Sequence, residues 1–174
     1  MRSIAPLLTI LLLAATPALA ESGSGWVEVA PQGAGFRVDM PSRPEPKRAV
    51  NSTFLGKVEN LRYRVVHEGT VLVVATAELP MLAKFTPRAI LFGEVRKSFL
   101  ESAGAKGGDL RDLTRGDEKG RSLDFESADP EDGREGYAEF FIKNGVVYTF
   151  MGEVAKGKSR KAVERFFESA RVGE

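Results

Sequence analysis

The second half of the chain, residues 108–155, is a run of short amphipathic segments separated by turn signals. Asn144-Gly145 is the strongest of these signals, because a two-residue type I′ hairpin needs positive φ at both central positions. Further turn signals lie at Glu118-Lys119-Gly120 and at Asp132-Gly133. Strands joined by such short turns pair antiparallel. The pattern therefore predicts a four-stranded antiparallel meander.

One segment of this meander, residues 136–142, carries aromatic residues on both of its faces. Side chains alternate across a strand, so Phe140 points to one face while Tyr137 and Phe141 point to the other. A strand that is apolar on both faces is covered on both sides. We therefore expect this segment to lie in the centre of the sheet.

Earlier segments predict further strands. Residues 26–30 and 36–40 bracket a turn, and residues 47–54 read as an edge strand that follows a proline-rich stretch. Two longer apolar segments, 57–67 and 71–79, meet at Glu68-Gly69-Thr70, where Gly can adopt positive φ. These segments predict a hairpin that ends at Pro80.

Two segments have helical periodicity. Thr86-Pro87 is typical of a helix start, and the apolar residues that follow form one stripe up to Gly104, a typical helix stop. The second helix is predicted to begin with Ser159 as its cap and to continue to about residue 171. The fold class predicted from these elements is α+β: a mainly antiparallel sheet of about six to eight strands with two packed helices, at about 86–103 and 159–171.

The first twenty residues have the features of a signal peptide that is removed on export. Arg2 supplies the positive charge, a Leu-rich run follows, and Ala18-Leu19-Ala20 forms a small-residue cleavage site. Cleavage between Ala20 and Glu21 would leave a flexible leader at 21–25 and one globular domain at 26–174. We therefore expect a periplasmic or secreted protein.

The chain has no cysteine, which excludes a lipoprotein anchor, disulfides, thiolate chemistry and cysteine-ligated metals. A domain of this length can be held together by its core alone. The chain carries 25 basic and 24 acidic residues, so removal of Arg2 with the signal would leave a formally neutral protein. That balance argues against a nucleic-acid partner and limits any membrane contact to a peripheral one through a local basic patch.

The two ends of the domain resemble the PsbP-like superfamily. The start, GFRVDMPSRPEP, is similar to the opening of many exported bacterial members, and the end, VVYTFMGEVAKGKSRKAVERFFESARV, is similar to their closing strand, basic loop and helix. Phe166, Phe167 and Ser169 carry the last match. The order of elements also fits. The chain resembles the bacterial branch, many of whose members have no assigned function.

This resemblance implies an antiparallel sheet between helices and a non-catalytic accessory or binding role. PsbP itself is an extrinsic subunit of photosystem II, and a nuclear relative binds a small GTPase. The group brings no catalytic residues to this sequence. Because a fold does not define a function, the partner stays open at this point.

Candidate binding residues are of two kinds. The densest basic run, KGKSRK, contains Lys156, Lys158 and Lys161, which could contact anionic lipid, a polyanion or an acidic partner. A pocket between sheet and helices could instead be lined by some of the large aromatic side chains, which are Tyr63, Tyr137, Tyr148 and Trp26.

Catalytic and metal-binding signals are weak. His67 is the only histidine, lies beside a hairpin turn and is not accompanied by a nucleophile motif. The acidic stretch DPEDG does not match a calcium-binding loop and reads as a turn. We expect no catalytic, metal or cofactor site.

Three hypotheses therefore remain. The first is a non-catalytic exported accessory protein that docks another exported or envelope protein. The second is a small-ligand-binding protein with an apolar pocket. The third is an enzyme, which the scarcity of histidine and cysteine disfavours.

Overall fold

The computed structural model describes residues 25–53 and 56–173 and confirms the α+β class. Within these residues, eight strands form a main sheet in which all neighbours run antiparallel. In sheet order the strands are β3 (Lys47–Thr53), β4 (Gly56–His67), β5 (Thr70–Glu78), β10 (Val146–Ala155), β9 (Arg134–Lys143), β8 (Glu118–Ser127) and β6 (Ala105–Gly107), with β7 (Arg111–Arg115) also paired to β8.

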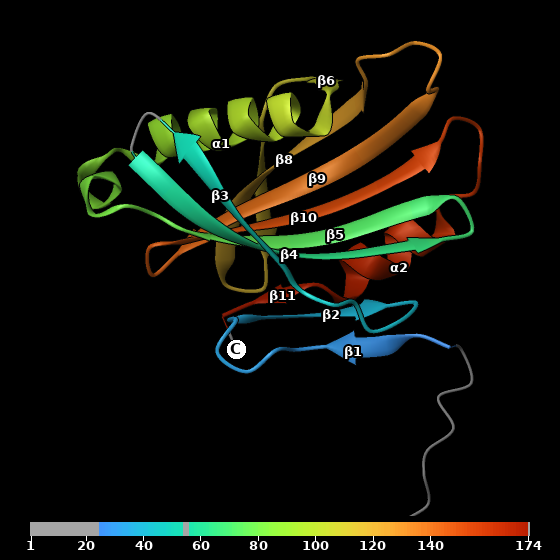
Figure 1. The fold of residues 1–174 in the computed structure, drawn as a ribbon, viewed down its shortest axis with the longest axis horizontal. Coiled ribbons are helices and arrows are strands. Elements are labelled where there is room, and N and C mark those ends of the chain that lie inside the picture. The colour runs from blue at the N-terminus through green and yellow to red at the C-terminus, as the bar shows by residue number, and fades with distance from the viewer. Residues whose placement is uncertain (1–24, 54–55, 174) are drawn as a thin grey trace, which may run out of the picture.

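A second, three-stranded sheet lies below the main sheet in Figure 1. It consists of β1 (Val27–Val29), β2 (Phe36–Met40) and β11 (Arg171–Val172). The sequence predicted the strands of β1 and β2 but not their separation from the main sheet. Pro41, Pro44 and Pro46 explain it, since proline lacks the donor that would continue strand pairing between β2 and β3.

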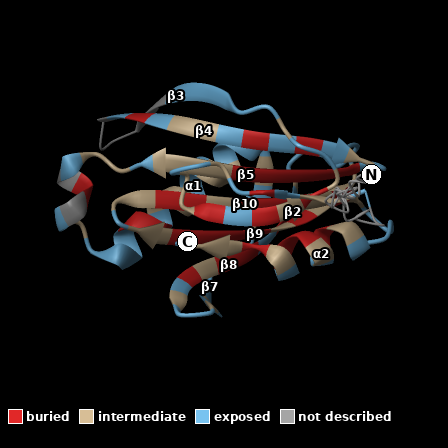
Figure 2. Ribbon diagram, turned by 90° about the horizontal axis from the view of Figure 1, so that it is seen from below, coloured by how far each residue is buried: buried red, intermediate tan, exposed pale blue. Residues whose placement is uncertain are grey.

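The helices cover opposite faces of the main sheet (Figure 1). After the short 3₁₀ helix η1 (Met81–Phe85), α1 (Arg88–Ala103) covers one face, which we call the α1 face. The other face packs against α2 (Lys161–Ser169) and the three-stranded sheet, and we call it the α2 face. β9 is buried on both sides as predicted, since Phe140 is 0% and Phe141 1% exposed. Figure 2 shows this buried centre, whereas the described side chains of β3, residues 47–50, are exposed.

Two of the predicted hairpin turns are confirmed by positive φ angles. Asn144 and Gly145 have φ of 51° and 77° between β9 and β10, as a type I′ turn requires. Glu68 and Gly69 have φ of 48° and 76° between β4 and β5. The short turns force these strands to pair antiparallel with their neighbours.

The turn predicted at Glu118-Lys119-Gly120 is wrong. These residues lie inside β8, and the turn falls at residues 116–117. Gly120 is needed in the strand rather than in a turn, because a methyl group there would stand 2.5 Å from the carbonyl oxygen of Phe140 and 2.7 Å from the ring of Phe141. The glycine therefore lets an aromatic ring pack across the strand.

The first helix begins two residues later than predicted and ends as predicted. Pro87 occupies the N-cap position with extended backbone, so Thr86 lies outside the helix. Gly104 takes the left-handed conformation, with φ 58° and ψ 43°, and terminates α1 after Ala103.

The second helix is shorter than the predicted 159–171. It runs from Lys161 to Ser169, and its N-cap residue is Arg160 rather than the predicted Ser159. The Ser159 hydroxyl still accepts a 3.4 Å hydrogen bond from the Lys161 amide. Its end is set by Ala170, whose backbone is extended, so that Arg171 and Val172 pair with β2 as a strand. The structure thus converts the predicted last helical turn into β11.

Candidate functional site

A cavity of about 290 Å³ opens between the main sheet and the turn that joins β1 to β2. It lies on the α2 face, at the end of the sheet where β3, β4, β5 and β10 meet. Its lining residues are Gln32, Gly33, Ala34, Arg48, Glu59, Leu61, Tyr63, Thr76, Glu78, Val146 and Tyr148.

Two of the four aromatic candidates, Tyr63 and Tyr148, line this cavity. The register places Tyr63 opposite Val74 and Tyr148 opposite Thr76, so both rings rise from the same face on either side of β5. Burial raises the pKa of both hydroxyls, so both remain neutral donors into the alkaline range. Gly35 allows the β1–β2 turn to close over Tyr148, because a methyl group there would stand 2.5 Å from the Tyr148 oxygen.

The mouth of the cavity is charged. Arg48 of β3 and Glu59 of β4 form a 2.5 Å ion pair across its rim, and both side chains are well exposed. Together with Thr76 and Glu78, this rim offers hydrogen bonds around two aromatic rings. Such a site suits a small polar molecule with an apolar part better than an apolar one.

Tyr137 lies away from the cavity. Its ring packs edge-on against Phe167 of α2, with centroids 4.9 Å apart, and its hydroxyl hydrogen-bonds to Ser122 and Glu139. Burial is the main cause that raises the pKa of Tyr137. Trp26, the fourth candidate, packs at the edge of the core with the guanidinium of Arg165 4.6 Å above its ring. Both residues have structural roles here.

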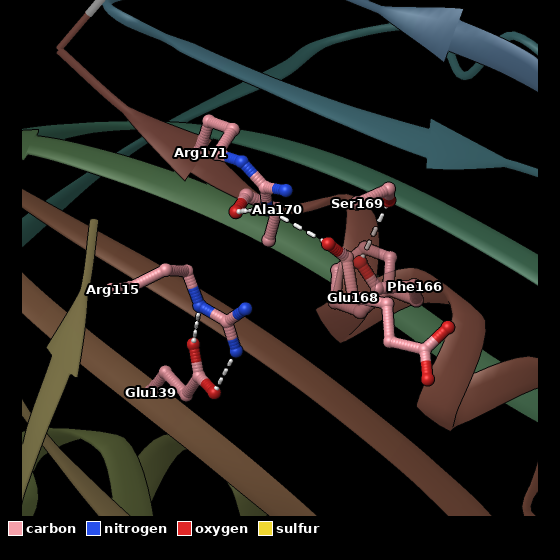
Figure 3. A network of polar contacts seen from close by, with 7 residues as sticks. All are labelled: Arg115, Glu139, Phe166, Glu168, Ser169, Ala170 and Arg171. Atoms are coloured by element: carbon pink, nitrogen blue, oxygen red, sulfur yellow. Dashed lines mark hydrogen bonds and ion pairs between the residues drawn. The ribbon is translucent and has the colours of Figure 1, made fainter.

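Glu139 is the buried charge of this region. It is 1% exposed, and Arg115 of β7 donates two hydrogen bonds to it, of 2.9 Å and 2.5 Å, as Figure 3 shows. The bidentate geometry gives each carboxylate oxygen a charged donor. Sequence reasoning had no means of finding this pair, because it joins residues 24 positions apart across two strands. It reads as a structural ion pair and not as a reactive group.

The three candidate lysines lie together but on a surface of mixed charge. Lys156 and Lys158 belong to the loop between β10 and α2, Lys161 is the first residue of α2, and all three are exposed. The backbone amide of Lys156 donates a 2.7 Å hydrogen bond to Gly133, which brings the loop beside the start of β9.

The arginines beside these lysines are neutralised. Arg134 pairs with Glu153, and Arg160 pairs with Glu135 at 2.7 Å. In the described part of the chain the lysine side chains themselves form no ion pair. The positive charge of this loop and helix start therefore rests mainly on the three lysine side chains.

His67 and the acidic stretch DPEDG both lie at turns. His67 ends β4, half-exposed, with its Nε2 3.9 Å from the carboxylate of Glu68. Asp129 accepts a 2.9 Å hydrogen bond from the Glu131 amide, as in a polar turn. Among the described residues, no group of three or more His, Cys, Asp or Glu could hold a metal ion.

One exposed apolar feature was not predicted from the sequence. Among the described residues, five large hydrophobic side chains are exposed, and three of them lie between residues 81 and 90. They are Met81 (75% exposed), Phe85 (85%) and Ile90 (53%), on η1 and the first turn of α1. We call these three residues the apolar knob. The stretch MLAKF after Pro80 was the available signal, since it contains apolar residues four positions apart outside any predicted element.

The knob lies at one end of the molecule, beside the start of α1 (Figure 1). Three large exposed apolar side chains within ten residues of chain make this end of the molecule a candidate interaction site. The proposed cleavage site, Ala20 and Glu21, lies outside the described residues. No helix in residues 25–53 and 56–173 is both long enough and apolar enough to cross a membrane.

The fold is PsbP-like by comparison with solved structures. The solution structure of cyanobacterial PsbP (CyanoP) from Synechocystis sp. PCC 6803 matches with a TM-score of 0.57, over 92% of this chain and 98% of that chain. The two sequences are 12% identical, so the likeness concerns the fold alone. No protein-family model matches the sequence, and no curated protein is significantly similar to it.

The structure explains why the FFxS motif carries the resemblance. Phe166 is fully buried, and Phe167 packs against it with ring centroids 5.1 Å apart. The Ser169 hydroxyl donates a 2.8 Å hydrogen bond to the Phe166 carbonyl (Figure 3). It also accepts one of 2.9 Å from the Asp39 amide. The motif therefore reports the docking of α2 onto β2, which is a requirement of the fold.

Proposed function

We propose that this chain is an exported, non-catalytic accessory protein of the bacterial PsbP-like branch, which works by docking another exported or envelope protein. The observation that carries the proposal is the apolar knob. A side chain such as Phe85, exposed over 85% of its surface, gains free energy when a partner covers it. The resemblance to an accessory family supports the same class of function.

The knob suits a partner that presents a shallow apolar groove. Met81 and Phe85 project from a short 3₁₀ helix, which can insert into such a groove as an anchor. Met adapts to irregular surfaces because its side chain is unbranched and polarisable. Flanking charged residues, such as the exposed Glu78 and Arg88, would form the polar rim of the interface.

Site-specific photo-crosslinking tests this proposal. A photoreactive phenylalanine analogue at position 85 should capture one defined partner in the native host, while the same analogue at Val66 should not. Val66 is a suitable control because it is also exposed, at 55%, but lies in β4 away from η1. The purified partner should then bind the wild-type chain and lose roughly tenfold or more in affinity to Phe85→Ser, as expected for an interface anchor. Equal crosslinking at both positions, or unchanged affinity, would refute the proposal.

Export is tested by the N-terminus of the processed protein. We expect the chain isolated from the periplasm or medium to begin at Glu21, as intact-mass and N-terminal peptide analysis would show. Ala20→Arg should block this processing, because the cleavage site requires a small residue. A chain that retains Met1 and stays in the cytoplasm would contradict the export proposal.

Small-ligand binding is the second candidate, and the cavity beside Tyr63 and Tyr148 is the observation that favours it. A ligand seated there should raise the melting temperature of the wild-type protein in a metabolite screen. Thr76→Phe would fill the cavity from β5 and should abolish such a shift. A hit that persists in Thr76→Phe would place the ligand elsewhere.

A further inference from the structure

A second pocket, of about 210 Å³, lies on the α1 face at the β3 edge of the main sheet. It is lined by Glu45, Lys47, Arg62 and Arg64, so three cations and one carboxylate surround it. All four residues are exposed to solvent and therefore accessible to a ligand.

The register of β3 and β4 brings the three cations together. Lys47 lies directly opposite Arg62, and Arg64 follows two positions later on the same face of β4. Like charges directly opposite each other on neighbouring strands destabilise a sheet. The fold thus maintains an unfavourable arrangement at this position.

In the described part of the chain no carboxylate lies within ion-pair distance of these cations, and Glu153, which pairs with Arg134, acts on Arg62 only at longer range. In the described part of the chain, none of Lys47, Arg62 and Arg64 forms a hydrogen bond or an ion pair from its side chain. Other arginines on the strands do, among them Arg111, Arg115 and Arg121. Burial is the main cause that lowers the pKa of Arg62, the charge of Arg64 lowers it further, and the charge of Glu153 partly offsets both.

The backbone around Glu45, the fourth wall of the pocket, is restricted by two neighbouring prolines. Glu45 lies between Pro44 and Pro46, and proline fixes the backbone φ on both sides of it. A pre-formed wall reduces the entropy that binding would otherwise lose. The restricted backbone keeps Glu45 beside the three cations that line the pocket.

We propose that this pocket binds phosphate, either as the free ion or as a phosphate monoester. Two guanidinium groups can bind its oxygens in bidentate fashion, and the Lys47 ammonium adds a point charge. The protonated oxygen of a phosphate, or a hydroxyl of its ester group, donates a hydrogen bond to Glu45. Sulfate has the same shape but no proton at neutral pH, so the Glu45 carboxylate repels it. The site goes beyond the docking role, since it lies on another part of the molecule.

Calorimetric titration and thermal melting of the full chain test this assignment. In chloride buffer at constant ionic strength, inorganic phosphate should raise the melting temperature and give a saturable binding isotherm. Sulfate at the same concentration should give a clearly smaller response. Equal responses to phosphate and sulfate would overturn the proposed role of Glu45.

Variants separate the site from general charge effects. Arg62→Gln with Arg64→Gln should weaken phosphate binding roughly tenfold to a hundredfold, because charge-assisted hydrogen bonds are lost. The matched control, Lys97→Gln with Lys106→Gln, removes the same charge from exposed positions on α1 and β6 and should bind phosphate like wild type. An equal loss of phosphate affinity in both double variants would overturn the proposed site.

Glu45→Gln gives a second test that does not depend on the arginine variants being folded. Glu45 lies in an exposed connection, and this substitution should let sulfate bind nearly as well as phosphate. If the Glu45→Gln variant still prefers phosphate over sulfate as strongly as the wild type, the role assigned to Glu45 is refuted.

Vesicles distinguish the two sources of phosphate. Those containing phosphatidic acid should bind the chain only if a lipid headgroup is the natural ligand, with pure phosphatidylcholine as control. Vesicle binding that survives Arg62→Gln with Arg64→Gln would overturn the site as a headgroup receptor.

Discussion

The arginines on the two faces of the main sheet differ in how their positive charge is balanced. On the α2 face, Arg115 is held by the buried carboxylate of Glu139 in a bidentate pair. On the α1 face, Arg62 and Arg64 stand beside Lys47, and among the described residues no carboxylate forms an ion pair with any of the three. A cation that serves the fold has its partner in the chain, whereas a cation that serves binding takes its partner from outside. The following predictions test this contrast.

The largest effect is expected from Arg115→Ala. The change leaves Glu139 buried without a counter-ion, and breaking a buried pair in this way costs about 3–5 kcal/mol of the free energy of unfolding. Urea denaturation would measure it. The control is Arg48→Ala, which breaks a well-exposed pair and should cost less than about 1 kcal/mol. Similar losses of unfolding free energy in both variants would contradict the distinction between the buried and the exposed ion pair.

A second test uses pH, because all three tyrosines of the chain lie on the α2 face. Burial raises the pKa of Tyr63, Tyr137 and Tyr148 above the ordinary value of about 10. Neutral tyrosines therefore contribute stability that is fully present below pH 10 and is lost as the pH rises through the folded-state values. In an alkaline titration, tyrosinate absorbance should then increase over the same pH range in which the circular dichroism signal of the tertiary structure is lost.

Tyr63→Phe removes one of these ionisations and should move the alkaline transition to higher pH. Full ionisation of the tyrosines near pH 10 in a protein that remains folded would show instead that the α2 face is open to solvent.

A smaller effect is expected from Ser169→Ala. The substitution removes the acceptor of the Asp39 amide and should cost about 1 kcal/mol, with a weaker attachment of α2 to β2. Hydrogen exchange would report it as faster exchange at the Asp39 amide. Ser102→Ala is the matched control, because the Ser102 hydroxyl bonds only to the carbonyl of Phe99 in its own helix. If Ser102→Ala lowers the free energy of unfolding as much as Ser169→Ala does, the FFxS motif has no special role in docking α2.

The smallest effect, with the opposite sign, is expected from Arg64→Gln. Relief of repulsion within the cation cluster should stabilise the ligand-free protein by a few tenths of a kcal/mol, up to about 1 kcal/mol. Chemical denaturation in chloride buffer would measure it. Loss of stability in phosphate-free buffer would mean that the cluster is structural after all.

The sequence alone determined the features that depend on neighbouring residues. The sequence correctly predicted the hairpin turns at Asn144-Gly145 and Glu68-Gly69 and the helix end at Gly104. Each of them requires a positive φ angle, which is a local requirement that few residue types meet. The two-sided burial of β9 was also predictable, since alternation along one strand reveals it.

Only the tertiary structure decided the features that depend on contacts between distant residues. Gly120 resembles a turn residue, yet it lies in a strand because Phe141 of the next strand occupies the space beside it. Arg171 and Val172 continue a helical pattern, yet they form a strand because β2 offers unpaired backbone groups there. The pairing of Lys47 with Arg62 and of Arg115 with Glu139 follows from sheet register, which local periodicity cannot specify across long intervals of chain. Local backbone preferences therefore defined the elements of this protein, and the packing of the sheet defined its sites.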